Sequence, residues 1–112
     1  MSKISIENLD WEKMGNLIPT IVQNYRTKDV LMLAYSNQKS LEKTLKTGLA
    51  TYWSRSRKEL WTKGKNSGNL QHLKEILYDC DEDALLFLVD PAGPACHTGN
   101  ETCFYRQLSS SF

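Results

Sequence analysis

Short blocks of hydrophobic residues, each the length of a β-strand, follow one another along most of the chain. Residues 17–25 and 30–35 are rich in Leu, Ile and Val and flank the polar segment 26–29, which predicts a β-hairpin with a four-residue connection. Aromatic, β-branched or continuous apolar residues predict further strands. These lie at residues 49–54, 60–62, 70–78, 84–89 and 102–106.

One segment has helical spacing instead. Leu41 and Leu45 are four residues apart and share a helix face, and Gly48 supplies a C-terminal stop. Ser36 or Asn37 can cap the N-terminus, so the helix is predicted to run to about Thr47.

The remaining segments are predicted loops. Glycines interrupt the polar residues 63–69, and two prolines and a glycine exclude regular structure at 91–94. Residues 107–112 are expected to form a flexible tail.

The pattern predicts an α+β fold with a mainly antiparallel β-sheet and one clear helix, because strands and helices do not alternate. At 112 residues the chain is expected to be a single domain over 1–112. Short strands with few helices leave sheet edges exposed, and a homodimer would cover them.

Composition narrows the class of protein. The chain is 40% hydrophobic and 24% charged, values typical of a soluble globular protein. No apolar run suits a signal peptide or a membrane span, so no membrane association and a cytoplasmic location are predicted. Three cysteines, an odd number, fit that compartment, and a net charge of +1 argues against nucleic acid as a partner.

Positive charge is concentrated in one stretch, which predicts a site for a small anionic ligand such as a phosphorylated metabolite. Arg55 and Arg57 can contact phosphate through two donors each, and Lys63 can act as a point charge. Ser67 lies in a glycine-containing loop whose backbone amides can face an anion. For each basic residue taken singly, a solvated surface charge is the alternative. Trp53 and Trp61 are more often core residues than stacking platforms for a base.

Carboxylates and thiols in the C-terminal third are the candidate metal ligands. In extended backbone Asp79, Asp81 and Asp83 would line one side and suit Mg²⁺. The thiolates suit Zn²⁺ and would leave one tetrahedral position open for water or substrate. The zinc ligands would be Cys80, Cys96 and Cys103.

Three alternatives remain open at this point. The aspartates can form a solvated turn, and the cysteines can be small buried apolar residues. The third is a closed structural site that adds His97 to the three cysteines, as in a small zinc-binding module that binds a nucleotide or a protein without chemistry.

The joint order and spacing of several motifs resembles one enzyme family, phosphoribosyl-AMP cyclohydrolase, over roughly residues 11 to 106. The segments 30–35, 53–57 and 60–64 agree with that family, as does Ser67-Gly68-Asn69. The most specific motifs are Asp79-Cys80-Asp81-x-Asp83, Gly93-Pro94-x-Cys96-His97-Thr98-Gly99 and Cys103-Phe104.

The resemblance implies a hydrolase of histidine biosynthesis, dependent on Zn²⁺ and Mg²⁺, that opens the purine ring of N1-(5-phosphoribosyl)-AMP between N1 and C6. It also implies that the three aspartates bind Mg²⁺. Cys80 of one subunit would bind Zn²⁺ together with Cys96 and Cys103 of its homodimer partner. A fused pyrophosphohydrolase domain, present in some relatives, is not expected in this chain.

Ring opening itself needs a nucleophile and a proton carrier. Ribosylation at N1 makes the purine electron-poor at C6, and zinc lowers the pKa of water toward about 7. His97 is the predicted general acid/base because an imidazole titrates near neutral pH. A zinc ligand or a structural histidine is its alternative role, and His72 is expected to be an ordinary surface or core residue.

Overall fold

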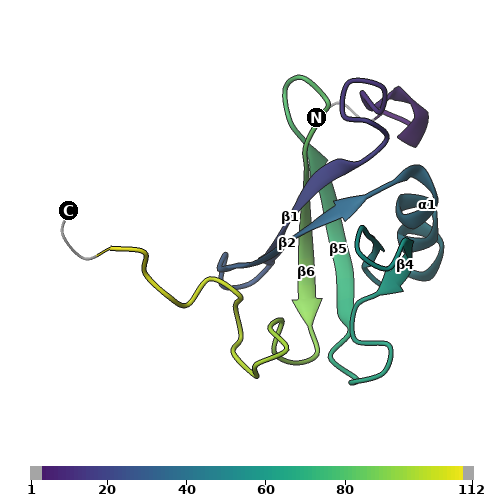
Figure 1. Ribbon diagram of the computed structural model, residues 1–112. Coiled ribbons are helices and arrows are strands. Elements are labelled where there is room, and N and C mark those ends of the chain that lie inside the picture. The colour runs from purple at the N-terminus through teal and green to yellow at the C-terminus, as the bar shows by residue number, and fades with distance from the viewer. Residues whose placement is uncertain (1–3, 110–112) are drawn as a thin grey trace.

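A four-stranded sheet is the main layer of the computed structural model, which describes residues 4–109. Its strands, in spatial order across the sheet, are β2 (Val30–Ser36), β1 (Ile18–Asn24), β6 (Leu85–Pro91) and β5 (Gln71–Tyr78). A second, two-stranded antiparallel sheet pairs β3 (Thr51–Ser54) with β4 (Glu59–Thr62). The helix α1 (Gln38–Thr47) and this small sheet cover one face of the main sheet, and a 3-10 turn, η1 (Ile6–Asn8), precedes them (Figure 1).

Capping explains where α1 begins and ends. The Asn37 side chain accepts a hydrogen bond from the Ser40 backbone amide at 2.8 Å, and the Ser40 hydroxyl accepts one from the Asn37 amide at 2.9 Å. This reciprocal pair satisfies two donors that the first helical turn leaves free. Gly48 ends the helix with a φ of 77°, a left-handed conformation that suits glycine. Asn37 is therefore the cap, and the predicted helix is confirmed.

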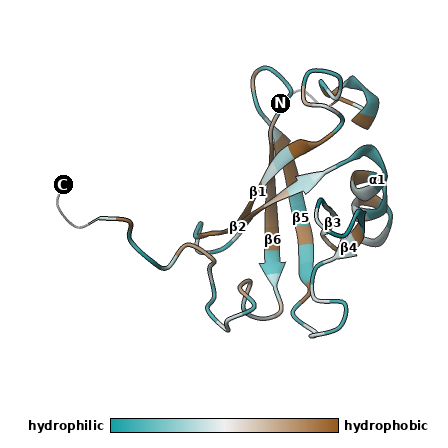
Figure 2. Ribbon diagram, in the orientation of Figure 1, coloured by the Kyte–Doolittle hydropathy of each residue, from teal (hydrophilic) through white to brown (hydrophobic). Residues whose placement is uncertain are grey.

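The core lies between the main sheet and the layer formed by α1 and the small sheet. Ile18 and Val22 of β1, Phe87 and Val89 of β6, and Tyr52 of β3 are all fully buried. Figure 2 shows apolar segments along the central strands of the main sheet. Because side chains alternate along a strand, these residues account for only one face of that sheet.

The opposite face carries an aliphatic row, the residues Leu33, Ile21, Leu86 and Leu77. They are direct cross-strand neighbours on β2, β1, β6 and β5, so their side chains point the same way. Ile21 is 42% exposed and Leu33 49% exposed. No element within residues 4–109 covers these two side chains.

The α+β class, the first hairpin and the strands flanking the acidic residues are confirmed. One pairing was not anticipated: β1 and β6 run parallel, with Ile21 opposite Leu86. β6 also extends to Pro91, which pairs with Gln71, so the predicted loop begins one residue later. The strand predicted at 102–106 is wrong. The Cys103 amide instead donates to the Leu31 carbonyl of β2, and the Thr102 hydroxyl contacts the carbonyls of Val30 and Leu31.

Residues 107–109 have no regular secondary structure, and the rest of the predicted tail, 110–112, lies outside the described residues. No helix in the described part of the chain is long and apolar enough to span a membrane.

Candidate functional site

Two of the three cysteines meet in the loop that follows β6, residues 92–103, here called the thiol loop. Backbone hydrogen bonds fold it back on itself: the Cys96 amide donates to the Asn100 carbonyl at 3.1 Å and the Gly99 amide to the Cys96 carbonyl at 3.0 Å. The Cys103 amide donates to the Leu31 carbonyl at 2.8 Å, which fixes the loop to β2. As a result the thiols of Cys96 and Cys103 are close enough for each to affect the ionisation of the other.

The surroundings of these thiols favour ionisation of one of them. The Thr98 hydroxyl donates to Cys96 Sγ at 3.0 Å, and this bond lowers the pKa of Cys96 below its usual value, with a smaller contribution from the positive charge of Lys63. Partial burial and the Cys96 thiol raise the pKa of Cys103. A thiol must be deprotonated to bind a metal, so these surroundings favour the form of Cys96 that could do so.

A second loop, residues 63–69, packs beside the thiol loop and is called the basic loop. Gly64, with a φ of 81°, lies directly against the Asn69 backbone, and Gly93 of the thiol loop lies against the Asn69 side chain. No side chain larger than hydrogen fits at either glycine without displacing Asn69. This contact places Lys63 close enough to act electrostatically on Cys96 and Cys103. The Ser67 hydroxyl accepts a hydrogen bond from the Asn69 amide at 3.2 Å and is exposed.

The predicted arginines lie on the β3–β4 connection. The Arg55 guanidinium stacks over the Tyr35 ring at 3.8 Å, and Arg57 forms an ion pair with Glu59 at 3.6 Å. Both side chains are exposed. Within residues 4–109 neither arginine has a hydrogen bond or ion pair to the thiol loop.

His97 is exposed although its neighbour Cys96 is buried. The imidazole has no hydrogen-bond partner in the described part of the chain, so it is free to meet a ligand. His72 is exposed on β5, and Trp61 packs against the core, as expected for both.

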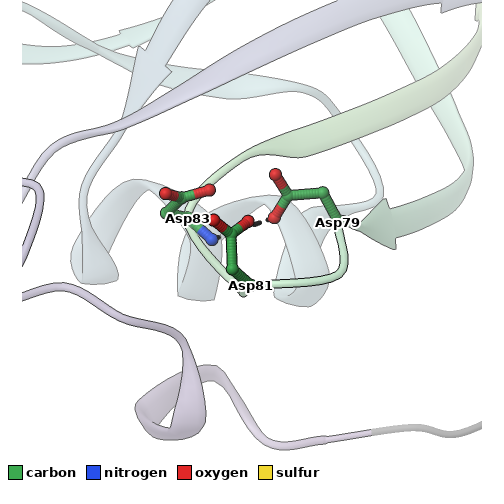
Figure 3. A group of neighbouring side chains, drawn as sticks. All are labelled: Asp79, Asp81 and Asp83. Atoms are coloured by element: carbon green, nitrogen blue, oxygen red, sulfur yellow. Dashed lines mark hydrogen bonds between the residues drawn. The ribbon is translucent and has the colours of Figure 1, made fainter.

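The three aspartates lie at the other end of β6, in the segment 79–84 that joins it to β5, here called the acidic turn. Their carboxylate oxygens lie within 4.8 Å of one another, and Figure 3 shows the three side chains gathered on one side of the turn. Asp79 Oδ1 accepts hydrogen bonds from the backbone amides of Asp83 and Ala84, at 3.0 and 3.2 Å. Three carboxylates at this spacing provide the oxygen ligands that Mg²⁺ prefers.

Lys13 is a residue of this cluster that the sequence did not reveal. Its ammonium lies 2.8 Å from Asp83 Oδ2 and 3.4 Å from Asp81 Oδ2. The hydrogen bond from Lys13 lowers the pKa of Asp83, whereas desolvation raises the pKa of the exposed Asp79. Lys13 is separated from the aspartates by most of the chain, so no local pattern signals the contact.

The structure corrects two expectations about these residues. The aspartates do not alternate along extended backbone, because the chain must reverse between β5 and β6, and Glu82 adopts a positive φ of 66° to make the turn. Their carboxylates nevertheless lie close together. The view that all three thiols are buried is also wrong, because Cys80 and Cys103 are exposed.

Cys80 is far from the other two cysteines of its own chain. It lies in the acidic turn before β6, whereas Cys96 and Cys103 follow β6, and the two loops stand at opposite ends of the sheet (Figure 1). The seven residues of β6 span about 20 Å at the usual rise per residue. Two sulfurs bound to one zinc ion are less than about 5 Å apart. One chain in this conformation therefore cannot bring all three cysteine sulfurs to one zinc ion.

Binding and catalytic residues are disproportionately found on loops positioned by a scaffold of strands or helices, and both loops described above carry ionisable side chains. The family model described as Phosphoribosyl-AMP cyclohydrolase matches residues 32–105. A protein of that name from Cenarchaeum symbiosum is 58% identical over 103 residues, covering 92% of this chain and 95% of the relative. One from Lacticaseibacillus casei is 63% identical over 98 residues, covering 88% and 89%. One from Archaeoglobus fulgidus is 61% identical over 100 residues, covering 89% and 92%.

The chain is thus similar to whole enzymes and not to a fragment of them. It belongs to the phosphoribosyl-AMP cyclohydrolase family, a family of hydrolases.

Proposed function

We propose that the chain opens the purine ring of N1-(5-phosphoribosyl)-AMP between N1 and C6, a hydrolytic step of histidine biosynthesis. The observation that carries this proposal is the similarity of the chain to relatives named Phosphoribosyl-AMP cyclohydrolase. The similarity extends over most of this chain and most of each relative. The thiol loop and the acidic turn supply side chains that such a reaction needs.

Cys96 and Cys103 would hold Zn²⁺ with a third thiolate. Their adjacent sulfurs, one of them favoured as thiolate, suit a soft or borderline cation. When bound, zinc supplies a Lewis acid that makes water acidic near neutral pH. Free thiols that serve as ligands need a reducing compartment, so we place the reaction in the cytoplasm.

The third thiolate would come from Cys80 of a partner subunit in a homodimer. The separation of Cys80 from the thiol loop along β6 supports this arrangement, because a two-fold axis that sets the strands of two copies in opposite directions brings each acidic turn near the partner's thiol loop. The half-exposed Ile21 and Leu33 of the aliphatic row provide an apolar surface that a second copy would cover. Such a dimer holds two equivalent sites.

The acidic turn would bind Mg²⁺ through Asp79, Asp81 and Asp83. Their carboxylate oxygens are near enough to share one cation. When bound, Mg²⁺ offsets the negative charge of a substrate that carries two phosphates. In the proposed dimer this cation would lie at the same site as the zinc ligands of the partner.

The chain's own side chains would orient the substrate and move protons. His97, exposed beside the buried Cys96, would give a proton to N1 as the ring opens and take one from the attacking water. Lys63 lies nearest the thiols and would bind one phosphate, with the Ser67 loop amides as further donors. Arg55 and Arg57, exposed on the β3–β4 connection, would bind the other phosphate.

A turnover assay combined with metal analysis tests the proposal. Purified chain is mixed with N1-(5-phosphoribosyl)-AMP and the ring-opened product is measured by chromatography, while zinc per chain is determined on the same sample. Cys103→Ser is expected to lose zinc and turnover together. No ring opening by the zinc-loaded wild type would overturn the proposed reaction.

Zinc removal distinguishes an enzyme from a structural zinc module. Chelation is expected to abolish turnover while the far-ultraviolet circular dichroism of the sheet and helix remains. If the chain unfolds on chelation and the reloaded protein has no turnover, a structural zinc site replaces the catalytic one.

A further inference from the structure

The acidic turn already has a cation in contact with it, the side chain of Lys13. The ammonium makes its short contact, 2.8 Å, to Asp83 and a longer one, 3.4 Å, to Asp81. These are two of the three carboxylates proposed to bind Mg²⁺, and all three lie within 4.8 Å of one another. The lysine therefore uses carboxylate oxygens that a metal ion would need.

Lys13 is held near the turn by the segment in which it lies. The Asp10 backbone amide donates to the Glu82 carbonyl at 2.8 Å, which joins this segment directly to the acidic turn. The Lys13 amide donates to Asp10 Oδ1 at 3.2 Å, and the neighbouring Trp11 is buried in the core. This anchoring gives the ammonium a high effective concentration at the carboxylates.

The ammonium is nevertheless free to leave. The Lys13 side chain is 49% exposed and the Asp81 side chain 56% exposed, so this longer pair is solvated and weak. The Asp83 side chain of the shorter pair is only 17% exposed, so that contact is the stronger of the two. Rotation of the flexible lysine side chain toward water would free the oxygens without moving the backbone. A divalent cation can therefore replace the ammonium at little structural cost.

We propose that Lys13 is a built-in competitor for the magnesium site, which occupies the acidic turn when metal is absent and thereby sets the metal affinity of the turn. The inference rests on the proposed Mg²⁺ site. Lys13 is then a positioning residue, because it occupies the carboxylates of the acidic turn before metal binds. Removing the ammonium must then tighten metal binding.

Titration with Mn²⁺ measures this directly, because Mn²⁺ prefers the same oxygen ligands and its free fraction is seen by electron paramagnetic resonance. The titration is carried out at about 0.15 M salt, where charges more than about 8 Å from the bound ion are largely screened. Only groups near the acidic turn should then change its affinity. Lys13→Met and Lys13→Gln are expected to bind Mn²⁺ roughly two- to ten-fold more tightly, given the small free energy of exposed ion pairs. Asp81→Asn identifies the binding that belongs to the turn.

Lys43→Met is the matched control, since Lys43 is also an exposed lysine but lies in the helix α1. It should leave the affinity unchanged. Equal or weaker Mn²⁺ binding by both Lys13 variants would overturn the inference and show that the lysine only holds the turn in shape. Tightening as large in Lys43→Met would also overturn it.

The metal titration and the turnover assay separate the two proposals. If Asp81→Asn leaves Mn²⁺ binding unchanged, the turn is not the metal site, and the inference fails with it. Ring opening by the same wild-type sample would leave the proposed reaction standing.

Discussion

His97 is exposed one residue after the buried Cys96, so a single step along the chain separates a possible proton carrier from a proposed metal ligand. His97→Asn removes the titrating group and keeps a polar side chain of similar size. We expect turnover to fall about 100- to 10,000-fold, the usual contribution of general acid/base catalysis, while zinc content stays near that of the wild type. His72→Asn, at an exposed position of β5, should change neither turnover nor zinc content. Loss of zinc in His97→Asn would instead favour a closed site with histidine as the fourth ligand.

Asp81 tests the acidic turn at the same scale. Asp81→Asn removes one negative charge and one anionic ligand, so the Mg²⁺ concentration needed for half-maximal turnover and the Michaelis constant should both rise. Zinc content should not change, because thiolates and not carboxylates are the proposed zinc ligands. Glu42→Gln removes the same charge from an exposed site on the helix α1 and serves as control. An unchanged Mg²⁺ dependence would reduce the turn to a solvated connection.

At the scale of elements, the contact of Gly64 and Gly93 with Asn69 joins the basic loop to the thiol loop. Gly64→Ala would place a methyl group against the Asn69 backbone at a positive φ. Overpacking of this kind costs about 1 to 3 kcal/mol, in addition to about 1 to 2 kcal/mol for the left-handed backbone. We expect a lower free energy of unfolding in urea and weaker zinc retention.

Gly68→Ala separates these two effects. Gly68 has a φ of 85°, yet an added methyl group would meet nothing within 4 Å. This variant should show the backbone cost alone and retain zinc normally. Equal losses in the two variants would mean that the contact between the loops does not organise the thiols.

Local pattern predicted the elements well and their pairing incompletely. The helix was predictable because Asn37, Ser40 and Gly48 are themselves the capping signals. The convergence of the aspartates followed from their spacing, although a turn and not a strand brings them together. The parallel contact of β1 with β6 and the contact of Lys13 with the acidic turn join residues that are remote in sequence, and nothing local encodes such contacts. The segment around Cys103 shows the same limit. Its expected strand does not form, and the Cys103 amide instead donates to a carbonyl of β2, which is remote in sequence.

At the scale of the whole molecule, the distance between Cys80 and the thiol loop predicts complementation between defective chains. Cys80→Ser and Cys103→Ser are each expected to be inactive as homodimers. In a mixed dimer, one shared site collects both lesions and the other is intact, so activity should recover to about half that of the wild-type dimer. Turnover is measured after subunit exchange, which mass spectrometry of intact dimers verifies. Exchange without recovery would mean that each site lies within a single chain.

The parallel pairing of β1 with β6 has a consequence for how the chain is made. Register partners such as Ile21 and Leu86 are separated by 65 positions. At ordinary elongation rates of about 5 to 20 residues per second, β1 waits about 3 to 13 s for its neighbour to be synthesised. The β1–β2 hairpin can form during that interval, but one edge of β1 stays open on the ribosome. An apolar strand in that condition is a natural target for chaperones, and slow codons between β2 and β6 would lengthen its exposure.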